Sequence, residues 1–165
     1  MSNNIFSKNI EKPKKIFSEL IIDKNNNVKN TFYLSSHKFY KKDEINENST
    51  LMCVINKELE GQQWKIDSKY EGIYEIKYNL DDYKMKNWNI FITNDENIIL
   101  LKDENSKKTA FILIEKDNNN NQFYIQDALS GKYLGIDTNK KRDKISFYLN
   151  LTNEKKFIWT LKNIE

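Results

Sequence analysis

The chain holds few side chains that could carry out covalent or metal chemistry. It has one histidine, His37, and one cysteine, Cys53, and such a pair cannot form a metal site by itself. A Cys–His nucleophile needs an exposed thiol, whereas Cys53 lies in the apolar run LMCVI at 51–55, where a thiol usually packs as a small buried group. Phosphate-binding, hydrolase and zinc-protease motifs do not occur. We therefore expect no enzymatic activity, no metal and no cofactor.

Residues suited to non-covalent recognition gather in the last quarter of the chain. They are Asp127, Asp137, Asn139, Tyr148 and Asn150. Carboxylate and amide oxygens can accept hydrogen bonds from neighbouring sugar hydroxyls, while an aromatic ring can lie against the apolar C–H face of a sugar. Asp and Asn also dominate turns for backbone reasons, so for any one of these residues an ordinary turn residue, or a surface tyrosine at Tyr148, is the more common explanation.

The pattern of apolar residues predicts an all-β domain to position these groups. Short runs rich in Ile, Phe, Tyr, Leu and Thr recur every 10 to 15 residues between clusters of Asn, Asp, Lys and Gly, and no sustained helical period is present. Residues 1–15 are polar and contain Pro13, so we expect a flexible arm at 1–15 and a single domain at 16–165. The twelve expected strands are 17–22, 31–34, 51–54, 64–66, 72–76, 89–92, 98–101, 111–113, 122–125, 132–136, 145–149 and 159–161.

These runs form three repeats of four strands each. Every fourth run starts with a large aromatic residue, and these residues, Trp64, Phe111 and Trp159, are 47 and 48 residues apart. Equivalent large apolar side chains carry most of the buried area of a core. We expect all three to fill a shared interior, and we expect at least one of the Gln62 and Gln63 amides to bond a neighbouring loop backbone.

The repeats resemble a known architecture. Four-stranded units that end near Q-x-W, as in GQQWKI at 61–66, and the phrase QFYIQDALSGKYLGID at 122–137 resemble the β-trefoils of the ricin-B-like and fascin-like superfamily. The resemblance covers about residues 16–162. It implies a six-stranded barrel closed at one end by three hairpins with pseudo-threefold symmetry, an arrangement that leaves few free sheet edges. It also implies carbohydrate binding, with a glycan or glycoprotein as the partner.

This chain lacks most of the side chains that form the usual sugar site of those proteins. The position of the sugar-gripping Asp falls on Ser35, Ile92 and Gly135, none of which is a carboxylate. Of the other positions in that pattern, only Gln62 and Phe147 keep a suitable side chain. We therefore expect glycan binding through loops of the third unit, by the five residues named above.

A protein-binding function is the alternative. The segment HKFYKKDEINENST at 37–50 exceeds the 2–5 residues that a hairpin connection requires, and long loops often carry function. Trefoils resembling protease inhibitors, cytoskeletal proteins or components of toxin and haemagglutinin complexes bind proteins through such loops. The residues concerned would be His37, Lys38, Phe39, Tyr40, Lys41 and Lys42; a tolerated insertion explains the segment equally well.

Charge and hydropathy limit the remaining partners. The net charge of +3 is not the concentrated basic field typical of nucleic-acid binding. The cluster Lys140-Lys141-Arg142 with Lys144 is a candidate anion site, although charge runs at hairpin tips are usually solvated faces. Residues 1–20 lack the apolar run of a secretory signal, and no segment is apolar enough to span a membrane. We expect a cytoplasmic protein, or one exported by a leaderless route or with its leader removed.

Overall fold

A computed structural model describes residues 12–22, 25, 27–36, 50–79, 88–102, 109–117 and 119–164. These ranges contain twelve strands, a single 3-10 turn, η2 (Glu60–Gln62), and no α-helix; nothing helical in them is long and apolar enough to cross a membrane. Each of the twelve expected runs falls on one strand. The strands are β1 (Lys14–Ile21), β2 (Lys29–Ser35), β3 (Met52–Ile55), β4 (Trp64–Tyr70), β5 (Ile73–Tyr78), β6 (Trp88–Ile92), β7 (Ile98–Lys102), β8 (Phe111–Lys116), β9 (Asn119–Asp127), β10 (Tyr133–Lys141), β11 (Ser146–Thr152) and β12 (Trp159–Asn163).

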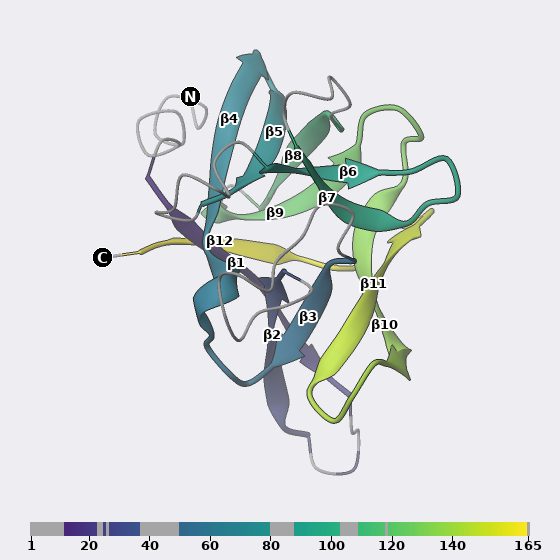
Figure 1. Cartoon of the computed structure of the whole chain (residues 1–165). Helices are drawn as coiled ribbons and strands as arrows, with labels where there is room; N and C mark the ends of the chain where they lie inside the picture. Colours follow the sequence, from purple (N-terminus) through teal and green to yellow (C-terminus); the bar gives the residue numbers. More distant parts are fainter. Residues whose placement is uncertain are drawn as a thin grey trace.

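Six strands close into a barrel. In the antiparallel ring, β1 pairs with β12 and β4, β5 pairs with β4 and β8, and β9 pairs with β8 and β12. The other six strands form the hairpins β2–β3, β6–β7 and β10–β11 (Figure 1). Neighbouring hairpins are joined where β11 pairs with β3 and where Thr50 bridges to Ile99. This arrangement is a β-trefoil, which confirms the predicted fold class.

The chain enters the barrel slightly before the expected start of the domain. Lys14 and Lys15 belong to β1 and pair with Asn163 and Lys162 of β12, and the Ile164 N–H donates to the Pro13 carbonyl at 3.0 Å. The paired part of the chain therefore begins about two residues before residue 16, within the usual uncertainty of a sequence boundary. Residues 1–11 of the expected arm lie outside the described ranges.

The three equivalent aromatic residues are buried where the barrel meets the hairpins. Trp64, Phe111 and Trp159 expose 0%, 1% and 0% of their surface. The Trp64 indole N–H donates to the Leu34 carbonyl of β2 at 2.9 Å, and the Trp159 indole N–H donates to the Leu134 carbonyl of β10 at 3.1 Å. In two of the three units, therefore, the core aromatic also bonds the hairpin backbone.

The glutamine that precedes Trp64 has a structural role. The Gln62 side chain is fully buried, its Oε1 accepts from the Leu59 N–H, and its Nε2 donates to the Lys57 carbonyl, both at 2.9 Å. The amide thus satisfies two backbone groups of the segment between β3 and β4.

Truncating Trp64 should destabilise the whole domain. Trp64→Ala removes a buried indole and leaves a cavity, which typically lowers the free energy of unfolding by about 3–5 kcal/mol. Trp64→Phe keeps most of the volume but orphans the Leu34 carbonyl, so a smaller loss of about 1–3 kcal/mol is expected. Urea denaturation measures both. A Trp64→Ala protein with an unchanged thermal midpoint would show that the indole is not part of the core.

The Cys53 thiol should be inert in the folded protein. It is completely buried in β3, and burial raises the pKa of the thiol well above its ordinary value, so the reactive thiolate is scarce and inaccessible. We expect slow labelling by a disulfide reagent in native buffer and rapid labelling in urea. Fast labelling of the native protein would contradict the buried position and would reopen the question of cysteine chemistry.

Candidate binding site

The usual sugar position of the third unit is closed by packing. Gly135 stands where the resemblance places the gripping Asp, and a Cβ atom there would lie 2.7 Å from Cδ2 of Phe157 and 2.9 Å from Oδ1 of Asn150. Phe157 is itself buried. Because a ring fills this space, position 135 must be glycine and no ligand-gripping side chain can stand there.

Four of the five expected sugar-binding residues lie on one hairpin. Asp137 and Asn139 are on β10, and Tyr148 and Asn150 are on β11. The strands are in register at Ile136↔Leu149 and again at Lys141↔Phe147, so a bulge places residues 137–140 opposite Tyr148 alone. Asp137 Oδ1 accepts from the Asn139 N–H at 3.1 Å.

The fifth residue, Asp127, lies elsewhere and is committed to a turn. At the end of β9, its carboxylate accepts from the Leu129 N–H and the Ser130 N–H, both at 3.2 Å, and from the Ser130 hydroxyl at 2.6 Å. The Gly131 N–H also donates to the Asp127 carbonyl, and Gly131 has a φ of 77°, a conformation that glycine adopts readily. The buried carboxylate of Asp127 therefore shapes the turn 128–131.

This turn forms one wall of a pocket of about 510 Å³. The opposite wall is the turn 93–97, which connects β6 and β7 of the second unit. A pocket of this size is typical of sites for small ligands. Its lining residues are Phe91, Ile92, Thr93, Asn94, Glu96, Thr109, Ala110, Asp127, Ala128, Leu129, Ser130 and Leu151.

The pocket lies where the second unit departs from the threefold pattern. Two residues before each core aromatic stand Gln62, Thr109 and Phe157, all of them buried. Gln62 and Phe157 have large side chains, and the Phe157 ring packs against Gly135 of the third-unit hairpin, whereas Thr109 is much smaller. Its hydroxyl accepts from the Ile92 N–H at 2.7 Å, which satisfies the hairpin backbone without filling the space. The small side chain thus leaves room for the pocket.

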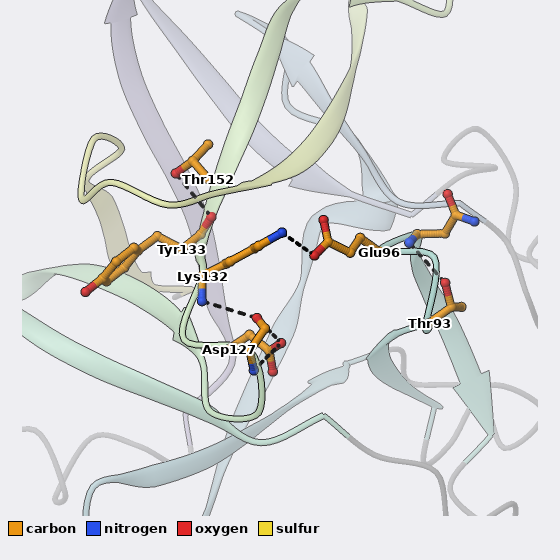
Figure 2. A network of polar contacts seen from close by, with 8 residues as sticks. Thr93, Glu96, Asp127, Lys132, Tyr133 and Thr152 are labelled. Carbon is orange, nitrogen blue, oxygen red and sulfur yellow. Dashed lines mark hydrogen bonds and ion pairs between the residues drawn. The ribbon is translucent and has the colours of Figure 1, made fainter.

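Polar contacts hold the two walls together. Lys132 Nζ lies 2.6 Å from Glu96 Oε2 and bridges the third-unit turn to the second-unit turn (Figure 2). Thr93 Oγ1 accepts from the Asn97 N–H at 3.0 Å, and the Ala128 N–H donates to the Ala110 carbonyl at 2.9 Å. An ion pair this exposed contributes at most about 1 kcal/mol, so backbone bonds of the turns set the shape and the ion pair adds to it.

The pocket combines apolar and polar lining groups. Phe91 and Leu151 are half-buried, whereas Asn94, Glu96 and Ser130 are exposed. Such a lining suits a neutral ligand with both an apolar face and hydroxyl groups. Sequence reasoning identified only Asp127 of this set. For the other lining residues, the sequence offered one sign. Of the equivalent residues Gln62, Thr109 and Phe157, Thr109 is the smallest, which indicates space in the second unit.

Two remaining expectations concern the protein-binding segment and metal binding. His37 to Lys42, and the rest of the long segment as far as residue 49, lie outside them. Within these ranges no group of three or more His, Cys, Asp or Glu side chains could hold a metal ion.

Comparison with known proteins places the chain by its fold. No protein-family description matches the sequence, and no curated protein matches it either. Solved structures do match: the designed threefold-symmetric protein ThreeFoil (11% identity, 92% of this chain and 99% of that chain, TM-score 0.61), SeviL bound to asialo-GM1 saccharide (15%, 93% and 98%, 0.60), and the BEL β-trefoil in a ligand-free crystal form (15%, 91% and 93%, 0.54). At these identities the likeness establishes the β-trefoil fold.

Proposed function

We propose that this protein is a non-enzymatic carbohydrate-binding module whose site is the pocket between the turns 93–97 and 128–131. The observation that carries the proposal is the coincidence of this pocket with the small residue Thr109, which stands where the first and third units have the larger buried side chains of Gln62 and Phe157. The third-unit turn supplies one wall, in keeping with a site in third-unit loops.

The lining supports a saccharide more than a purely apolar ligand. Phe91 offers an aromatic side chain against which the C–H face of a pyranose can pack. Asn94 and Glu96 offer amide and carboxylate oxygens that can accept from hydroxyl groups. Ser130 can do the same, although its hydroxyl already bonds Asp127. Because the polar lining residues are exposed, a longer oligosaccharide can extend from the pocket into solvent.

The likeness to solved trefoils is compatible with this function. SeviL, with a TM-score of 0.60, was solved with the asialo-GM1 saccharide bound, so a trefoil of this general shape can hold an oligosaccharide. A fold hosts many functions, and the argument for this chain therefore rests on the pocket.

A screen of neutral glycans followed by calorimetry tests the proposal. We expect at least one neutral saccharide to bind. Asn94→Ala should then weaken the affinity about 3- to 10-fold, the usual effect of losing one hydrogen-bonding partner. Ala128→Trp should abolish binding because a large side chain on the exposed rim would fill the pocket.

The matched control is Asn139→Ala, which removes an equally exposed asparagine from the β10–β11 hairpin and should leave the affinity unchanged. Loss of binding in Asn139→Ala with retention in Asn94→Ala would move the site to that hairpin and refute the pocket. A silent glycan screen together with a stoichiometric protein partner, lost when residues 41–49 are deleted, would replace carbohydrate binding by protein binding.

A further inference from the structure

The tip of the β10–β11 hairpin carries concentrated positive charge. Residues 137–144 contain Lys140, Lys141, Arg142 and Lys144 against two carboxylates, Asp137 and Asp143, a formal charge of +2 in a chain whose total is +3. The four basic residues are all exposed. Among the described residues, no carboxylate forms an ion pair with the three lysines, whereas Lys77 and Lys132 elsewhere are paired at 3.0 Å and 2.6 Å.

The carboxylates of the tip are engaged with the backbone. Asp143 Oδ1 accepts from the Ile145 N–H at 3.0 Å and from the Ser146 N–H at 2.9 Å, and Asp137 Oδ1 accepts from the Asn139 N–H. The Arg142 N–H donates to the Ser146 carbonyl at 2.9 Å and closes the turn. These bonds fix the shape of the tip and leave the ammonium groups facing solvent.

Two of the lysines are held in place by aromatic rings. Lys140 Nζ lies 5.0 Å from the centre of the Tyr148 ring, and Lys141 Nζ lies 5.3 Å from the centre of the Phe147 ring. Cation–π contacts of this length are attractive. They restrict side chains that otherwise lose much conformational freedom when they bind a ligand. Lys140 belongs to the bulge at 137–140 that lies opposite Tyr148.

We propose that this tip is a second binding site, separate from the pocket, and that it takes a polyanionic saccharide through its sulfate or carboxylate groups. Exposed ammonium groups hold a single small anion only weakly, so the ligand must present several charges to several lysines at once. The half-buried Tyr148 ring beside Lys140 offers the apolar contact that a sugar ring can use.

Two other polyanions fit the tip less well. Nucleic acid would need a basic surface longer than one hairpin tip, and this chain has a single arginine. An anionic membrane surface favours apolar side chains that insert beside the basic ones. Of the exposed large apolar residues in the described ranges, none lies at this tip; they are Ile21, Ile22, Val28, Tyr70 and Leu129.

The test measures binding of a fluorescent sulfated heparin hexasaccharide by anisotropy at 0.15 M salt. We expect saturable binding by the wild-type protein and a loss of about tenfold or more in the triple variant Lys140→Gln, Lys141→Gln, Lys144→Gln, since each exposed charge pair adds a modest factor. The matched control triple is Lys29→Gln, Lys57→Gln, Lys162→Gln, which removes the same charge from exposed positions elsewhere and should bind within about twofold of wild type.

Acetylation footprinting of the wild-type protein gives a second readout that needs no variant to fold. Lys140, Lys141 and Lys144 should be protected by the hexasaccharide, whereas Lys29, Lys57 and Lys162 should not. Equal losses in the two triple variants, or equal protection at both sets of lysines, would overturn the site. So would the absence of wild-type binding at 0.15 M salt.

Two further probes test the class of ligand. A 20-nucleotide single-stranded DNA and phosphatidylserine vesicles should bind more weakly than the hexasaccharide. Equal or tighter binding of either would overturn the assignment to a saccharide. The affinity of the pocket for a neutral glycan should be the same in the triple variant Lys140→Gln, Lys141→Gln, Lys144→Gln as in the wild-type protein. The two proposed sites are therefore tested independently of each other.

Discussion

Where each hairpin joins the barrel, backbone N–H and carbonyl groups are buried and need hydrogen-bond partners within the protein. The rest of the structure depends on how each of the three units supplies these partners. In the first and third units, the indole N–H of Trp64 or Trp159 donates to a hairpin carbonyl. In the second unit Phe111 has no donor, and the Thr109 hydroxyl instead accepts from the Ile92 N–H. A buried polar group without a partner is costly, so each unit keeps one such bond. The residue two positions before each aromatic, Gln62, Thr109 or Phe157, differs in size between the units.

Among the described residues, that difference coincides with a pocket in the second unit. Gln62 and Phe157 are larger side chains, both buried, whereas the turns 93–97 and 128–131 beside the small Thr109 enclose about 510 Å³. Asp127 fixes the second turn through three bonds to its carboxylate. A pocket whose wall is fixed before binding loses less conformational entropy when a ligand enters, which favours recognition by shape.

The fold was largely predictable from sequence, whereas the pocket was not. The period of the apolar runs and the spacing of Trp64, Phe111 and Trp159 are local signals, and each expected run falls on a strand. The pocket instead depends on the size of Thr109 and on the approach of two turns from different units. The pair Glu96 and Lys132, 36 residues apart, leaves no local signal. Asp127 resembled a ligand carboxylate because the acceptor that grips a sugar hydroxyl can equally close a turn; the following Ser130 and Gly131 were the sign of a turn.

The measurement that tests the account most directly is a nuclear magnetic resonance titration of the ¹⁵N-labelled protein with a neutral saccharide selected from the glycan screen. Binding in the pocket predicts that backbone amide shifts concentrate at residues 93–97, 109–110 and 128–131, with little change at residues 137–150. Shifts centred on residues 137–150 or 37–49, with residues 93–97 and 128–131 unmoved, would contradict the pocket as the carbohydrate site.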